Sequence, residues 1–178
     1  MSAPEKLVVG LGNPGERYAG TRHNVGWMIV GTYAEEHGAD LIQEPTDRKP
    51  SRLRRSGTTL FAEPTTYMNR SGTEVGRLMG YYKLEPADLL VVSDDLDLPF
   101  GELRLRDTGG SGGHKGLEDI AEQLGTGDFS RLRVGIGRPQ NGMDASDFVL
   151  QRFSKAEAER LPEIGKAAAQ RITEWLDV

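Results

Sequence analysis

The stretch DLLVVSDD (residues 88–95) decides the fold class of this chain, because it is apolar along its length and abruptly acidic at its carboxyl end. A short apolar run of this kind is typical of a strand buried on both faces of a sheet. KLVVGLG (6–12) and RLRVGIG (131–137) predict two more strands. Helical patterns over 24–37 and 116–124 alternate with these runs, and this alternation favours an α/β fold.

Shorter elements complete the prediction. SRLRRSG (51–57) and TTLFAEP (58–64) are typical of two strands joined by a turn at Ser56-Gly57. ELRLR (102–106) alternates like a half-exposed strand, whereas 71–82 and the segment from Ser154 onward favour helices. We therefore expect one domain over residues 1–178, with a mixed, partly parallel twisted sheet flanked by helices.

Composition narrows the possible chemistry. The chain has 178 residues and no cysteine, which excludes disulfides, thiolate metal sites and a cysteine nucleophile. The sequence predicts neither a secretory signal nor a membrane span, so we expect a cytoplasmic protein.

The net charge of −5 taken alone argues against a nucleic-acid partner. The charge is unevenly distributed, however. One base and six acids lie within 83–102, whereas RKPSRLRR (48–55) carries five bases and no acid.

Two glycine clusters invite phosphate-binding interpretations. GLGNPG (10–15) satisfies G-x-G-x-x-G after a strand. A dinucleotide site would also need a helix starting within the motif and an acid about 20 residues further on, at the end of the next strand. Neither is present, so a plain turn remains an alternative. GGSGGHKG (109–116) lacks the Gly-Lys-Ser/Thr triplet of a P-loop, although its N–H groups suit a phosphate or carbonyl oxygen.

Metal sites are weakly indicated. The three histidines are far apart in sequence and form no H-E-x-x-H motif. Asp94, Asp95 and Asp97 could hold Mg²⁺, but solvated or capping acids at a strand end are the alternative that we favour. We expect neither a metal nor a cofactor.

A histidine and a carboxylate form the best candidate for chemistry. His23 lies at the start of a predicted helix, whose positive end favours a neutral ring, and Asp94 ends the central strand. A carboxylate on one imidazole nitrogen would fix the tautomer of a base, and without a nucleophile elbow the nucleophile is water. The amides of Asn13, Asn24 and Asn69 could hold a carbonyl or water. Helix capping by His23, Asn24 and Asn69 is the structural alternative.

Five segments together resemble bacterial-type peptidyl-tRNA hydrolases. They are GLGNPGERYAGTRHNVG (10–26), PTTYMNRSG (64–72), DDLDLPFGELRLR (94–106), GGSGGHKGL (109–117) and RLRVGIG (131–137). The resemblance implies a monomeric, metal-free α/β esterase that cleaves the ester between a peptide and the 3′ ribose of tRNA. Such an enzyme recycles peptidyl-tRNA that the ribosome releases prematurely.

The resemblance also assigns catalytic roles. It implies that His23 is the general base, that Asp94 stabilises it, and that Asn13 helps to distinguish blocked from free aminoacyl groups. It implies substrate contacts at further positions, namely Tyr18 and Tyr67 at the tRNA acceptor end and Asn24, Asn69, His114 and Lys115 along the substrate groove. Arg106 and Arg133 match basic positions that clamp a tRNA phosphate.

Three features depart from the family pattern. Lys115 stands where the family usually has asparagine, the segment 44–58 is short and basic, and the terminal helix usually continues further. Two other functions therefore stay open: a catalytically weak RNA-binding relative of the same fold, and a hydrolase of small esters that binds no RNA. The presence of Asn13, His23, Asn69 and Asp94 argues against an inactive RNA-binding relative. Arg106 and Arg133 argue against a hydrolase that binds no RNA.

Overall fold

A seven-stranded mixed sheet forms the centre of the structure, a computed structural model that describes residues 2–178. Its strands lie in the order β2-β3-β4-β1-β5-β7-β6. Their bounds are β1 Lys6–Gly10, β2 Asp40–Gln43, β3 Ser51–Ser56, β4 Thr59–Pro64, β5 Leu89–Asp95, β6 Leu103–Arg106 and β7 Ser130–Gly135. The helices are α1 Val25–Glu36, α2 Ser71–Tyr82, α3 Lys115–Leu124, α4 Ala145–Val149 and α5 Lys155–Leu176.

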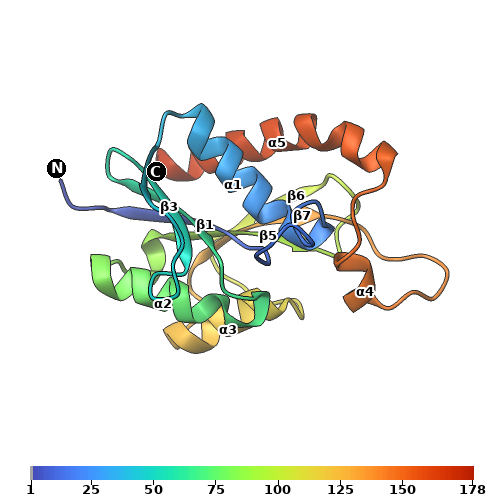
Figure 1. The fold of residues 1–178 in the computed structure, drawn as a ribbon, viewed down its shortest axis with the longest axis horizontal. Helices are drawn as coiled ribbons and strands as arrows, with labels where there is room; N and C mark the ends of the chain where they lie inside the picture. Colours follow the sequence, from blue (N-terminus) through green and yellow to red (C-terminus); the bar gives the residue numbers. More distant parts are fainter. Residues whose placement is uncertain (1) are drawn as a thin grey trace.

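The four central strands are parallel. β1 pairs with β4 and β5, and β5 pairs with β7. Leu7 and Val9 belong to the apolar cluster on one face of the sheet, and Val8 belongs to the cluster on the other. Helices α1 and α5 cover one face and α2 and α3 the opposite one (Figure 1). Burial on both faces explains why these strands are almost continuously apolar.

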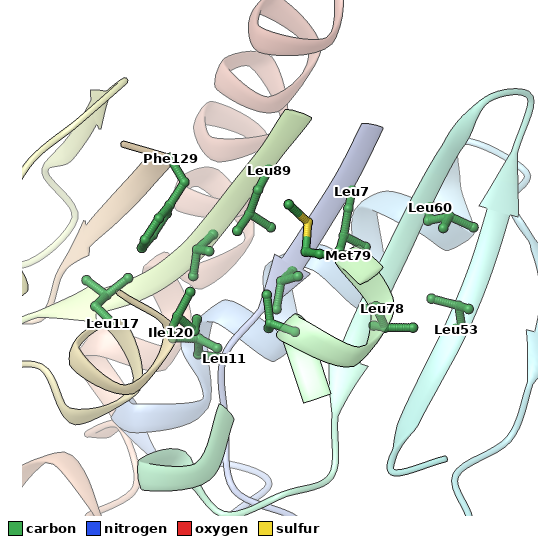
Figure 2. Packing of buried hydrophobic residues seen from close by; sticks show 14 of the residues in the cluster. Leu7, Leu11, Leu53, Leu60, Leu78, Met79, Leu89, Leu117, Ile120 and Phe129 are labelled. Atoms are coloured by element: carbon green, nitrogen blue, oxygen red, sulfur yellow. The ribbon is translucent and has the colours of Figure 1, made fainter. Parts of the chain in front are cut away.

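The cluster beneath α2 and α3 joins the helices to the sheet. Figure 2 shows Leu7 and Leu89 of adjacent strands facing Met79 of α2, with Ile120 of α3 beside them. All four side chains are almost completely buried. This packing holds α2 and α3 against the same face of the sheet.

The fold class predicted from the sequence is confirmed. The predicted hairpin is formed by β3 and β4, which pair in antiparallel register. β6 pairs in antiparallel register with β7 and forms the second edge of the sheet. Two short elements were not predicted, the edge strand β2 and the helix α4. The predicted strand over 131–137 is confirmed as β7, although β7 ends earlier, at Gly135.

A close approach between β5 and α1 positions the turn that carries His23. A Cβ atom on Gly26 would overlap the carbonyl oxygen of Val92, so only glycine lets the helix approach the strand this closely. The backbone of Leu11 continues the contact, since its N–H donates to Val92 and its carbonyl accepts from Trp27. The 3₁₀ turn Arg22–Asn24 is thereby placed against the carboxyl end of the parallel strands.

Within residues 2–178, none of the helices is both long enough and apolar enough to cross a membrane.

Candidate active site

A cavity of about 860 Å³ opens at the carboxyl ends of the parallel strands. Open α/β sheets usually bind ligands at this edge, where loops diverge from the strands. It is lined by the loop after β1 and the turn that carries His23, the end of β5, the segments that lead into α2 and α3, Arg133 of β7, Arg138, and the helix α4 with Leu150 after it. The sequence-predicted residues among them are Asn13, His23, Tyr67, Asn69, Asp94, His114, Lys115 and Arg133.

His23 and Asp94, which are 71 positions apart in the chain, form a hydrogen-bonded pair. The Nδ1 atom of His23 lies 2.8 Å from Oδ2 and 3.0 Å from Oδ1 of Asp94. Since the ionised carboxylate can only accept, Nδ1 carries the proton and Nε2 keeps a free lone pair. This tautomer suits a general base, because Nε2 is the atom that takes a proton.

Asp94 receives a second histidine on the same carboxylate. The Nε2 atom of His114 donates to Oδ1 over 2.8 Å, and the Asp94 side chain is only 2% exposed. Burial alone would raise the pKa of Asp94, but the charges and hydrogen bonds of His23 and His114 outweigh it and hold the pKa well below its usual range. Asp94 is therefore ionised throughout the neutral pH range.

His114 also begins a helix. Its Nδ1 atom accepts the backbone N–H of Gly116 over 3.1 Å and that of Leu117 over 3.3 Å, so the ring caps α3. Because Nδ1 accepts, the ring proton must lie on Nε2, where it points to Asp94. The resemblance implied that His114 lines the groove. The ring does line the cavity, and it also anchors the carboxylate that holds His23.

The two histidines and Asp94 have ligand atoms within 4.8 Å of one another, as a metal site would require. A metal would bind Nε2 of His114 only if the proton there moved to Nδ1. Nδ1 faces two backbone N–H donors, so that proton transfer would break the cap of α3. The donor geometry therefore suits hydrogen bonding better than metal binding.

The basic partners of Asp94, Asp95 and Asp97 argue against the interpretation of these acids as a Mg²⁺ site. Asp95 lies 3.4 Å from the guanidinium of Arg133, and Asp97 forms an ion pair with Arg138. Asp94 is occupied by the two histidines. Each carboxylate is matched by basic groups of the chain, so the cluster is not a shared cation site.

The side chain of Asn24 holds the backbone of Asn13 through two hydrogen bonds. The side chain of Asn24 accepts the Asn13 N–H and donates to the Asn13 carbonyl, both over 2.9 Å. Asn24 is completely buried and does not line the cavity; its amide is engaged by Asn13 and not presented to the cavity. Its side chain does not cap α1 either.

A backbone hydrogen bond fixes the orientation of the Asn13 carboxamide. Its Oδ1 atom accepts the backbone N–H of Met68 over 2.8 Å. The Nδ2 donors of Asn13 are left for a ligand in the cavity, which is what an incoming carbonyl oxygen requires.

Asn69, Tyr67 and Lys115 lie on the rim of the cavity. Asn69 belongs to the 3₁₀ turn before α2 and is exposed; the N-cap residue of that helix is Arg70. Tyr67 is 58% exposed, which leaves its ring free to stack on a partner. Lys115 is the first residue of α3, and its ammonium group approaches Glu118 only to 3.8 Å. All three side chains are accessible to a large substrate.

Besides Asn24, two of the residues expected to contact substrate do not line the cavity. Tyr18 is half-buried in the loop before the 3₁₀ turn, with the guanidinium of Arg17 against its ring. Arg106 is exposed on the edge strand β6 and donates to the carbonyl of Leu105. Contact with substrate at these residues requires a ligand that extends beyond the cavity.

Arg133 lies at the cavity wall and has partners within the chain. It approaches Asp95 and donates to the carbonyl of Gly110 in the glycine-rich loop. In the pairing of β6 with β7, Arg104 lies opposite Arg133 and Arg106 lies opposite Arg131. Arg106 and Arg133 are therefore diagonal neighbours on one face of the sheet. A phosphate at this face could meet both guanidinium groups.

Sequence reasoning missed several residues of the site. Arg70 and Arg138 carry charge at the cavity, and α4 supplies a wall made of Ala145, Ser146, Val149 and Leu150. Asp144, a residue type that favours the position before a helix, was the signal for that helix. The basic run 48–55 proves partly structural, because Arg54 binds Glu35 and Glu63.

A histidine paired with a buried carboxylate, with an amide donor alongside, is an arrangement suited to a hydrolase on an α/β fold. Comparison with known proteins narrows this class. The sequence model described as "Peptidyl-tRNA hydrolase" matches residues 7–178. The chain belongs to the peptidyl-tRNA hydrolase family.

Individual relatives agree with this assignment. A peptidyl-tRNA hydrolase from Chloroflexus aggregans is 50% identical, over 93% of this chain and 89% of its own length. One from Symbiobacterium thermophilum is 44% identical, over 96% of this chain and 94% of its own. The crystal structure of peptidyl-tRNA hydrolase from Acinetobacter baumannii superposes with a TM-score of 0.88 at 33% identity, covering 99% of this chain and 91% of that one.

Proposed function

We propose that the chain hydrolyses the ester between a peptide and the 3′ ribose of tRNA with a water molecule that His23 activates. As a member of its family, the chain is a hydrolase that acts on peptidyl-tRNA. The observation that carries the mechanism is the pairing of His23 with a buried carboxylate, which leaves Nε2 as the free base.

The reaction follows from this arrangement. Nε2 of His23 takes a proton from water while the oxygen of that water attacks the ester carbonyl. The imidazolium that forms is stabilised by the ionised Asp94. Nδ2 of Asn13 donates to the carbonyl oxygen as negative charge develops on it. The ribose hydroxyl leaves with the proton that His23 returns, so free tRNA and a free peptide result.

Basic side chains and exposed side chains on the cavity rim would recognise the tRNA. Arg106 and Arg133 would clamp a phosphate of the acceptor stem, while Tyr67, Asn69 and Lys115 would contact the 3′ end. Tyr18 would make a contact outside the cavity. Contacts to the backbone suit an enzyme that must accept many tRNAs and peptides. We further propose that the chain acts as a monomer in the cytoplasm, where peptidyl-tRNA arises.

One assay tests the proposal. The purified protein is incubated in EDTA with N-acetyl-aminoacyl-tRNA and, separately, with free aminoacyl-tRNA. We expect hydrolysis of the blocked ester only, and near-complete loss of turnover in His23→Ala. Normal turnover in His23→Ala, or an absolute need for added metal, would contradict the mechanism. Tight tRNA binding without any hydrolysis would instead favour the RNA-binding relative.

A further inference from the structure

Arg22, the residue immediately before His23 in the 3₁₀ turn, is buried against α4 and the start of α5. Its side chain is only 8% exposed and forms an ion pair of 2.7 Å with Glu157 at the start of α5. It also donates to the carbonyl of Phe148 in α4 over 3.2 Å. The guanidinium lies 4.0 Å from the centre of the Phe148 ring, which adds a cation–π contact.

Backbone contacts also join residues 21–22 to residues 151–152. The N–H of Arg22 donates to the carbonyl of Gln151 over 3.0 Å, and Thr21 forms an isolated antiparallel bridge with Arg152. The side chain of Gln151 accepts from Arg22 as well, over 3.4 Å. Residues 21–22 and 148–157 are therefore joined through both main chain and side chains.

The segment held in this way forms one wall of the cavity. α4 has five residues, and it supplies Ala145, Ser146 and Val149, with Leu150 following. It lies at the end of the molecule opposite the two termini, between connecting segments (Figure 1). A helix this short has no stability of its own in water, so its place depends on what anchors it. Among the described contacts, Arg22 is the charged anchor that reaches α4 and α5 together.

Arg22 is also connected to His23, the proposed base. Arg22, His23 and Asn24 make up a single 3₁₀ turn, so a shift in the backbone of Arg22 moves the His23 ring relative to Asp94. Displacements of about 1 Å between reacting groups can reduce turnover by roughly 10²-fold. The same arginine thus fixes one wall of the cavity and the placement of the base.

We infer that Arg22 is a positioning residue that sets the α4 wall at a defined distance from His23. The guanidinium suits this task better than an ammonium, because its planar fork can serve Glu157 and the Phe148 carbonyl at once while stacking on the ring. The inference rests on the proposed function, since His23 is the proposed base and the α4 wall lines the cavity that would hold the peptidyl group.

Three variants test the inference: Arg22→Met, Arg22→Lys and Glu157→Gln. For each, kcat and KM are measured with N-acetyl-aminoacyl-tRNA, together with hydrogen exchange of residues 145–152 in the absence of substrate. We expect Arg22→Met to lower kcat/KM by roughly tenfold or more, with KM raised and kcat reduced, and to accelerate exchange in the wall. Arg22→Lys and Glu157→Gln should fall between it and the wild type.

The ion pair between Arg160 and Glu163, also on α5, provides the matched control. It is exposed and lies outside the cavity lining, so Arg160→Met and Glu163→Gln should leave kcat/KM and exchange unchanged. A purely structural Arg22 would lower the melting temperature yet leave kcat, KM and wall exchange at wild-type values, and that result would overturn the inference. If Arg22→Met does not fold, Glu157→Gln decides on the same readouts. An inactive wild type would instead contradict the proposed function, while exchange would still report on the anchor.

Discussion

Asp94 is the residue on which the candidate base depends, and its replacement by asparagine keeps the shape of the side chain while removing the charge. An amide at this position can donate to His23 and so favour the wrong tautomer. We expect Asp94→Asn to lower kcat by roughly 10²- to 10⁴-fold with little change in KM. Single-turnover kinetics with saturating enzyme will measure this, and a kcat within threefold of wild type would contradict the role.

The same residue predicts a pH dependence of stability. The pKa of Asp94 in the folded chain lies below the unfolded value of about 3.9. The ionised carboxylate therefore stabilises the fold above about pH 4, and this contribution is lost as pH falls through the folded-state pKa. The difference in melting temperature between wild type and Asp94→Asn should be full at pH 6–7 and shrink below about pH 4. An equal difference at pH 7 and pH 3 would contradict the shift.

His114 combines two tasks that a single substitution removes together. His114→Ala deletes the cap of α3, which should lower the free energy of unfolding by about 1 kcal/mol. It also deletes a hydrogen bond to the carboxylate that holds His23, so kcat should fall as well. Urea denaturation and steady-state kinetics will separate the two effects. Lower stability with unchanged kcat would show that His114 is a cap alone.

Individual residues of the site differed in how far the sequence could predict them. His23 and Asp94 were predicted as a pair, because each stands at an element end where polar groups gather. The contact between His114 and Asp94 was not, since it depends on how a flexible glycine-rich loop folds back over the strand end. The pairing of Asn24 with Asn13 was not predicted either, because nothing at its sequence position indicates that its amide binds the backbone of Asn13.

Among the elements, α1 sets the position of the catalytic turn through its contact with β5. In Gly26→Ala, the new methyl group would overlap the Val92 carbonyl and displace α1, so both stability and kcat should fall. Gly76→Ala in α2 is the matched control, because no other atom lies within 4 Å of its added Cβ. Alanine should there raise the free energy of unfolding by roughly 0.5–1 kcal/mol and leave kcat unchanged.

Urea denaturation will measure the stability of both glycine variants, and steady-state kinetics will measure their kcat. Equal behaviour of the two would show that the approach of α1 to β5 does not limit the site.

Elements with clear periodic patterns could be predicted from the sequence, and those without could not. α1 was expected over 24–37 and lies at Val25–Glu36, because its apolar residues recur at helical spacing. β2 has only four residues and is largely exposed, so it carries no burial pattern. α4 is held by contacts with Arg22 that are remote in sequence, and no local pattern reports them.

At the scale of the molecule, the acidic net charge coexists with a basic face. Arg106 and Arg133 lie on one side of the β6–β7 pair, whereas the acids near Asp94 are matched by histidines and arginines. The average charge of −5 therefore says little about the surface that would meet tRNA.

The salt dependence of KM should report this face. Arg106→Gln should raise KM, leave kcat unchanged and reduce the slope of log KM against log salt by about 1. Arg171→Gln serves as the control, because that arginine lies on α5 beside Glu174. A slope unaffected by Arg106→Gln would show that this arginine does not meet a phosphate.

The strand order has a consequence for how this chain is made. β1 is synthesised early, yet its neighbours in the sheet are β4 at 59–64 and β5 at 89–95, and β7 follows only at 130–135. Pairings so remote in sequence slow folding. β1 has no partner on either side until β4 has left the ribosome, and one of its edges stays open until β5 follows. An enzyme that acts on peptidyl-tRNA would itself expose unpaired apolar strands while it is still attached to tRNA on the ribosome.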